Sequence, residues 1–168
     1  NSGSAMELDE ETLALITRIV HKKQIQTLWF EAHYMYRHQL ADFAARFAPA
    51  TVKFRCGVES FNPTLRQQWR KGIPAQVSPE DIAHYFQGVC LLCCTEGDSR
   101  ERILADIKTA RQHFEYFSIN VSSASVRFLR SVIRVSRMRL FTNSLQVHFT
   151  TFQPRTSLRL SSLMNPFG

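Results

Sequence analysis

The chain alternates between two spacings of apolar residues, one typical of helices and one typical of strands. Apolar residues three and four positions apart predict helices that follow Asp9, that span residues 37–47, and that run from Ser99 to about His113. Short runs rich in Val, Ile and Phe predict strands at 25–30, 52–58, 89–94 and 116–121. Two shorter helices are expected where a capping residue precedes proline, one after Asn62 and one from Ser78 to near Gln87.

The order of these elements predicts an α/β fold. Strands that are separated by helices favour parallel pairing with right-handed crossovers. The four predicted strands are too few to close a (β/α) barrel, so the expected architecture is an open arc of parallel strands, a partial barrel. This first domain is expected to span residues 1–121.

The segment 52–72 carries the strongest candidate for function. A predicted strand ends at Glu59, a turn follows, and Asn62 and Pro63 begin a helix. Ligand sites of parallel α/β folds lie at the carboxyl ends of strands. Glu59 is therefore the first residue to test. Glu31 and Asn120 end two of the other predicted strands.

The same segment resembles a known enzyme family. The motifs are GVES at 57–60, KG at 71–72 and GDSRE at 97–101, in that order and spacing. They are similar to the middle of the core domain of radical S-adenosylmethionine (SAM) enzymes, and the resemblance covers about residues 1–121. It implies a SAM-dependent enzyme that works with a 4Fe-4S cluster.

The resemblance implies a cofactor-binding set at the strand ends, which consists of Glu31, Glu59, Ser60, Glu96 and Asn120. Each of three residues also has a purely structural alternative: Glu31 as an exposed partner of Arg37, Glu59 as an acid that caps the turn, and Asn120 as a turn residue. Lys53 and Arg55 alternate out of one strand, so either is expected to be solvated or to pair with Glu31 or with the SAM carboxylate.

The cysteines do not match the cluster loop of the family. That loop reads C-x-x-x-C-x-x-C, whereas the four cysteines here are Cys56, Cys90, Cys93 and Cys94. Adjacent residues of a strand point to opposite faces, so a joint zinc site with His84 is not expected either. We expect buried, reduced thiols, no metal ligands, and a chain that holds the SAM-binding part of the enzyme but is inactive alone.

Charge divides the chain into two segments. The formal net charge is +7, yet acidic and basic residues are equal in number before Ser122. Residues 122–168 contain Arg but no Lys, Asp or Glu, and they supply the whole excess. We expect an irregular, poorly ordered basic tail, with strands drawn at most at 132–140 and 145–152. Either this tail is read out of frame relative to the family sequence, or it is a genuine basic extension.

The tail leaves two alternative functions open. Its arginines suit phosphate binding, so the chain is alternatively a nucleic-acid-binding module. It is also alternatively an α/β interaction module without catalysis. There is no apolar run of membrane-spanning length and no signal-peptide pattern, so we expect a cytoplasmic protein without a membrane partner. No pattern identifies the substrate.

Overall fold

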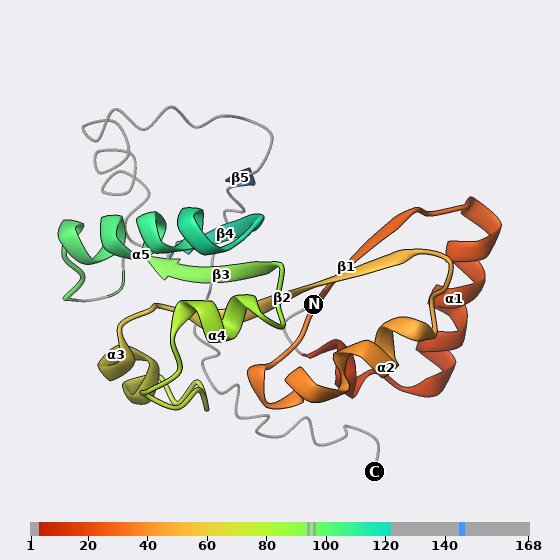
Figure 1. Cartoon of the computed structure of the whole chain (residues 1–168), viewed down its shortest axis with the longest axis horizontal. Coiled ribbons are helices and arrows are strands. Elements are labelled where there is room, and N and C mark those ends of the chain that lie inside the picture. Colours follow the sequence, from red (N-terminus) through yellow and green to blue (C-terminus); the bar gives the residue numbers. More distant parts are fainter. Residues whose placement is uncertain (1–3, 94, 96, 122–144, 147–168) are drawn as a thin grey trace, which may run out of the picture.

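The computed structural model describes residues 4–93, 95, 97–121 and 145–146. Within them, helices and strands alternate along the chain (Figure 1). The helices are η1 (Ala5–Glu7), α1 (Glu10–Lys23), η2 (Tyr34–Gln39), α2 (Leu40–Ala45), α3 (Pro63–Gln68), α4 (Pro79–Ala83) and α5 (Arg100–His113). The strands are β1 (Thr27–Glu31), β2 (Thr51–Glu59), β3 (Gly88–Cys93), β4 (Tyr116–Val121) and β5 (Leu145–Gln146).

The strands form one sheet in the order β1-β2-β3-β4-β5, and every neighbouring pair is parallel. The first four strands curl into a half-barrel, which confirms the predicted partial barrel. Pairing starts with Thr27 opposite Thr51 and is regular except near the end of β2, where the register shifts between Cys56 and Glu59. All strand carboxyl ends therefore lie along the same edge.

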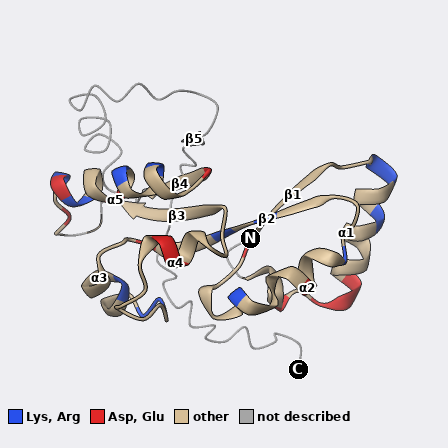
Figure 2. Cartoon of the chain, in the orientation of Figure 1, with Lys and Arg blue, Asp and Glu red and all other residues tan. Residues whose placement is uncertain are grey.

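Local capping explains where the helices begin. Asp9 Oδ1 accepts a hydrogen bond of 2.8 Å from Thr12 N at the start of α1. Ser78 and Asp81 form a reciprocal capping box at the start of α4, followed by Pro79 at the first helical position. Acidic residues cluster at the amino end of α1 and basic residues at its carboxyl end, as the helix dipole favours (Figure 2).

The described helices pack on one face of the sheet. In β2, Phe54, Cys56 and Val58 alternate into the buried core, which also contains residues of α1, α2, α4 and α5. Helices α1 and α2 accompany β1 and β2 at one end, and α4 and α5 accompany β3 and β4 at the other (Figure 1). This layering leaves alternate residues of each strand on the second face, called here the inner face.

Two predicted helices are shorter than expected. The helix predicted at 37–47 begins instead as the 3-10 helix η2 and becomes α-helical only in α2. The reason is a cap at His33, whose Nδ1 accepts from Met35 N at 3.2 Å and starts a tighter turn. The helix after Ser78 ends at Ala83 rather than near Gln87, because Phe86 is fully buried and Gln87 Oε1 accepts from Phe54 N of β2.

Most of the predicted tail lies outside the described residues. Of its two candidate strands, the one at 132–140 falls there entirely. The other, at 145–152, is described only as β5, which pairs with β4 through Leu145 opposite Phe117. Among the helices that are described, none is both long and apolar enough to cross a membrane.

An aromatic cluster should contribute strongly to stability. The ring of Phe47 lies 5.2 Å from that of Phe30 and 5.5 Å from that of Phe43, and Phe47 is fully buried. We expect Phe47→Ala to lower the free energy of unfolding by about 3–5 kcal/mol in urea denaturation, since it leaves a cavity. Met35→Ala, at a residue that is 61% exposed, should change it by less than about 0.5 kcal/mol. Equal effects would contradict this packing.

Candidate functional site

The inner face of the sheet is polar rather than apolar. Opposite the buried residues of β2 stand Arg55, Gly57 and Glu59, each only partly exposed. The adjacent strand β1 adds Glu31 to the same face, and β4, two strands away, adds Ser118. Charged groups that are partly removed from water need partners, so the pattern of contacts decides what this face can bind.

A hydrogen-bond network of side chains crosses the middle of the inner face. Arg55 Nη2 donates to Glu31 Oε2 at 2.8 Å, and Arg55 Nη1 donates to Ser118 Oγ at 3.4 Å. Ser118 Oγ shares a hydrogen bond of 2.9 Å with Cys90 Sγ, and Asn120 Nδ2 donates to the same sulfur at 3.3 Å. Arg55 thus links β1, β2 and β4. The hydrogen-bond network includes two of the predicted site residues, Glu31 and Asn120.

The expected alternative for Glu31 is therefore wrong. Arg37 does not pair with this carboxylate but lies over the ring of Tyr34, with 4.7 Å between its guanidinium carbon and the ring centroid. Of the alternatives left open for Arg55, the structure shows the pairing with Glu31. Lys53 instead pairs with Glu115 and lies over the ring of Trp29.

Glu59 lies at the rim, where β2 ends. Lys71 Nζ donates to Glu59 Oε1 at 3.1 Å, whereas Glu59 Oε2 is buried and has no hydrogen-bond partner among the described residues. A Cβ placed on Gly57 would lie 3.5 Å from Glu31 Oε1 and 3.7 Å from Glu59 Oε1. The Oε1 atoms of the two predicted carboxylates therefore face the same space above Gly57, and the other oxygen of Glu59 is a buried acceptor without a partner among the described residues.

Two aromatic rings lie on the inner face toward the amino ends of the strands. Trp29 and Tyr116 lie 5.3 Å apart between ring centroids, and a Cβ on Gly88 would come within 3.1 Å of the Trp29 ring. The missing side chain of Gly88 thus makes room for the indole. Trp29 is still 43% exposed, so its ring is accessible to a ligand on this face.

Ser60 does not join this group. Ser60 is fully buried, and its hydroxyl donates at 2.7 Å to Asp106 Oδ2 of α5. Glu96 lies outside the described residues. Their contact with a cofactor stays a prediction.

Sequence reasoning missed Asp106 and its partner Arg102. Asp106 accepts hydrogen bonds from Ser60 Oγ, from Phe61 N and from Arg102 Nη1. Burial raises the pKa of Asp106, while these three hydrogen bonds act in the opposite direction. The signal was available, since position 106 belongs to the buried stripe of α5 that also contains Ile103, Ile107 and Ala110. An acid on such a stripe needs a specific partner.

The described cysteines do not converge on a metal. Cys56 and Cys93 point into the core, whereas Cys90 faces inward beside Ser118. All three are buried, and burial raises the pKa of both Cys56 and Cys90. Within the described ranges, no three His, Cys, Asp or Glu residues come together as a metal site. These three thiols therefore do not fit an iron–sulfur cluster, and the expectation of buried thiols is confirmed for them.

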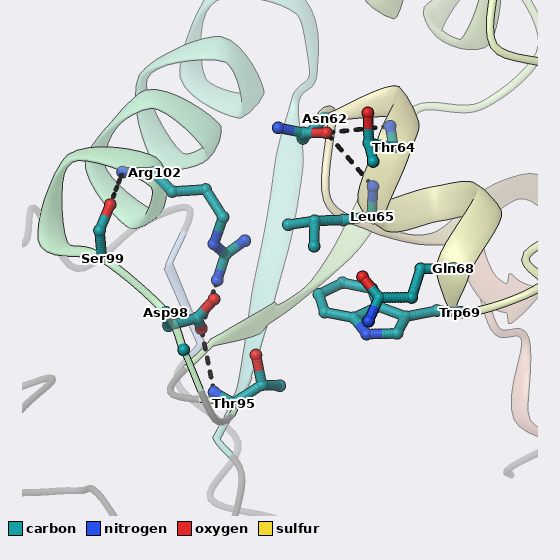
Figure 3. Close-up of a pocket in the computed structure, with 10 residues that line it drawn as sticks. Asn62, Thr64, Leu65, Gln68, Trp69, Thr95, Asp98, Ser99 and Arg102 are labelled. Carbon is teal, nitrogen blue, oxygen red and sulfur yellow. Dashed lines mark hydrogen bonds and ion pairs between the residues drawn. The ribbon is translucent and has the colours of Figure 1, made fainter.

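A pocket of about 560 Å³ opens between α3 and the loop before α5 (Figure 3). Leu65, Gln68 and Trp69 project into it from α3, and Asp98 and Arg102 face them across the opening. None of the described site residues predicted from the sequence lines this pocket. It is separate from the space above Gly57.

The Arg55–Glu31 pair should matter more than an exposed ion pair of the same length. Each side chain is 27% exposed, whereas Arg46 and Glu10, also 2.8 Å apart, are 42% and 79% exposed. We expect Arg55→Ala to lower the free energy of unfolding by about 1–3 kcal/mol, because Glu31 and Ser118 lose their donor. Arg46→Ala should cost less than about 1 kcal/mol. Thermal and urea denaturation measure both, and a larger loss for Arg46→Ala would contradict the assignment.

Comparison with known proteins supports the resemblance to radical SAM enzymes. Neither a protein-family model nor a curated protein sequence matches the chain. A solved structure does: it is a queuine lyase from Clostridium spiroforme bound to SAM and queuine, a radical SAM enzyme. It shares 32% sequence identity with a TM-score of 0.67, over 72% of this chain and 52% of its own.

The chain thus spans about half the length of this neighbour. The match joins sequence identity to a shared arc of parallel strands. It confirms the resemblance that the GVES, KG and GDSRE motifs predicted: the described part of the chain is similar, in sequence and in its half-barrel fold, to about half of a radical SAM enzyme.

Proposed function

We propose that the chain is the SAM-binding part of a radical SAM enzyme and that the rim of its inner face holds SAM. The observation that carries this proposal is the pair of carboxylates, Glu31 and Glu59, whose Oε1 atoms face the space above Gly57 at the strand ends, while the second oxygen of Glu59 is buried without a hydrogen-bond partner among the described residues. Strand ends are where ligands of parallel α/β folds bind. The neighbour, with 32% identity, was solved with SAM bound.

The residues present at the rim fit SAM. Glu59 accepts hydrogen bonds only, so it suits the ribose hydroxyls or the ammonium group of SAM. Lys71, which is within reach of both Glu59 and the space above Gly57, suits the SAM carboxylate. Gly57 leaves that space open, since a methyl group there would stand at ordinary contact distance from Glu31 and Glu59. When bound beside an iron–sulfur cluster, SAM supplies the radical that abstracts hydrogen from a substrate.

The cluster itself belongs to another part of such an enzyme in this proposal. Cys56, Cys90 and Cys93 lie on different faces of the sheet, and the printed sequence contains no C-x-x-x-C-x-x-C. The roles of the described residues are therefore to bind SAM, to orient it and to keep water from the strand ends. On these grounds we propose that the chain is inactive alone.

For the substrate, we propose a nitrogen heterocycle related to queuine, which the neighbour binds. The inner face below Gly57 offers complementary groups. Glu31 Oε1 accepts ring or amino N–H groups, and the Arg55 guanidinium donates to carbonyl or ring nitrogen acceptors. Trp29 and Tyr116 supply aromatic faces for stacking. The substrate would thus lie between these rings and the SAM at the rim.

SAM binding tests the proposal directly. We expect the full chain to bind SAM in equilibrium dialysis and Glu59→Gln to weaken the affinity about tenfold, because a charge-assisted hydrogen bond is lost. Gly57→Ala should weaken it as well, with little change in unfolding, because the methyl group occupies ligand space and the φ of Gly57 is not positive. Glu10→Gln, which alters a carboxylate on the exposed Arg46 pair, is the control and should leave affinity unchanged.

If the unaltered chain shows no saturable binding of SAM, the proposal is wrong. Loss of affinity in Glu10→Gln as large as in Glu59→Gln would mean that the effect is one of net charge and not of the rim.

Iron–sulfide reconstitution under anaerobic conditions tests whether the cluster is bound by another part of the enzyme and not by this chain. We expect the chain to gain no visible thiolate–iron absorbance, because its described thiols do not meet and two of them are in the core. The same chain fused to a segment that carries C-x-x-x-C-x-x-C should gain that absorbance. A stable cluster on the chain alone would contradict the proposed role and would require a different set of ligands.

A further inference from the structure

The turn that carries Glu59 is strained. Glu59 has φ of 62°, a left-handed conformation that residues with a side chain rarely adopt. Ser60 N donates to Val58 O at 2.8 Å, so Val58, Glu59 and Ser60 form a three-residue turn, the tightest kind. Such a conformation persists only when the surrounding structure enforces it. The contacts that enforce it are therefore part of how Glu59 is aimed.

Asp106, which lies on α5, contacts both residues that follow Glu59. Its Oδ2 accepts from Ser60 Oγ at 2.7 Å and its Oδ1 accepts from Phe61 N at 2.9 Å. Ser60 Oγ in turn accepts from Asn62 N at 3.1 Å, so the turn and the start of α3 are held together. The two oxygens of one buried carboxylate thus accept hydrogen bonds from the two residues that follow Glu59.

Asp106 is itself held in place. Arg102 Nη1 donates to Asp106 Oδ2 at 2.6 Å, and Arg102 Nη2 donates to Asp98 Oδ2 at 2.5 Å and to Leu92 O of β3 at 3.2 Å. Figure 3 shows Arg102 reaching from α5 toward Asp98, with α3 on the other side of the pocket. Arg102 therefore connects the Asp106 carboxylate to the backbone of β3, and this contact fixes the position of the carboxylate relative to the sheet.

We propose that Asp106 is the positioning residue of the SAM site: it holds the Glu59 turn in its strained form and so directs the Glu59 carboxylate over Gly57. The ligand part of this inference rests on the proposed function, whereas the conformational part stands on the contacts alone. Ser60, predicted from the sequence to contact SAM, acts here through Asp106 instead.

A comparison of glycine with alanine at position 59 tests the conformational part. Both substitutions remove the carboxylate and its bond to Lys71, so their difference reports only the backbone. At φ of 62° glycine is unstrained and alanine is strained. In the unaltered chain we expect Glu59→Gly to be more stable than Glu59→Ala by about fivefold in the unfolding equilibrium constant, measured in urea.

In the Asp106→Asn background this advantage of glycine should disappear or reverse, because a released turn relaxes to negative φ, where alanine is preferred. Asp98→Asn is the matched control. The side chains of Asp98 and Asp106 are 4% and 5% exposed and share Arg102, but Asp98 does not contact the turn, so the glycine advantage should persist. If Asp106→Asn does not fold, Ser60→Ala serves in its place, because it removes one of the two hydrogen bonds to Asp106. The stability advantage of glycine over alanine at position 59 should be smaller in the Ser60→Ala background.

SAM affinity tests the ligand part. Asp106→Asn should bind SAM about tenfold more weakly in equilibrium dialysis with Glu59 intact, and Asp98→Asn should bind as the unaltered chain does. If no form binds SAM, the proposed function fails, while the glycine comparison still decides whether Asp106 holds the turn. A glycine advantage that survives Asp106→Asn, or unchanged SAM affinity in that variant, would overturn the assignment of Asp106.

Discussion

The structure depends on one constraint: the described helices cover a single face of a parallel sheet. Parallel sheets are normally buried on both faces. In this half-barrel the second face carries charged and polar side chains, and those in its middle pair with one another. Arg55 is central to that arrangement, because its guanidinium contacts Glu31 on one neighbouring strand and reaches Ser118 two strands away on the other side. An apolar inner face would require another layer to cover it, whereas a polar inner face can stay in contact with water.

The same constraint explains where an acceptor is left over. The middle of the inner face is internally paired, from Glu31 through Arg55 and Ser118 to Cys90. At the rim the pairing is incomplete, since Lys71 satisfies one oxygen of Glu59 and the other stays buried without a partner. Incomplete pairing and a strained backbone occur at the same residue. Such coincidences are found at functional sites, where structure elsewhere in the fold enforces an unfavourable local conformation.

The neighbour gives this geometry a chemical context. A queuine lyase solved with SAM and queuine shares the arc of strands with 32% identity. Two of the radical SAM motifs form the rim: GVES contains Gly57 and Glu59, and KG contains Lys71. The third motif, GDSRE, contributes Gly97, Asp98 and Ser99 to the pocket beside Trp69, next to the Arg102 network. The motifs are thus divided between the rim and this pocket.

Local pattern determined the elements and their order. Caps at Asp9, Asn62, Ser78 and Ser99 began helices as expected, because a capping bond involves only residues two or three positions apart. The strands lay within two residues of their predicted bounds, and parallel pairing followed from their alternation with helices. The position of Glu59 at a strand end was equally a property of the sequence.

Only the tertiary structure decided which side chains meet. The register shift between Cys56 and Glu59, the burial of Ser60 and the grip of Asp106 on a turn 46 residues earlier depend on how β2, β3 and α5 pack. Apolar periodicity says which face of a helix is buried but not which polar group it meets there. For that reason Asp106 escaped prediction even though it stands on the buried stripe of α5. Contacts between residues distant in sequence are set by strand register and helix packing, and neither is encoded in a local pattern.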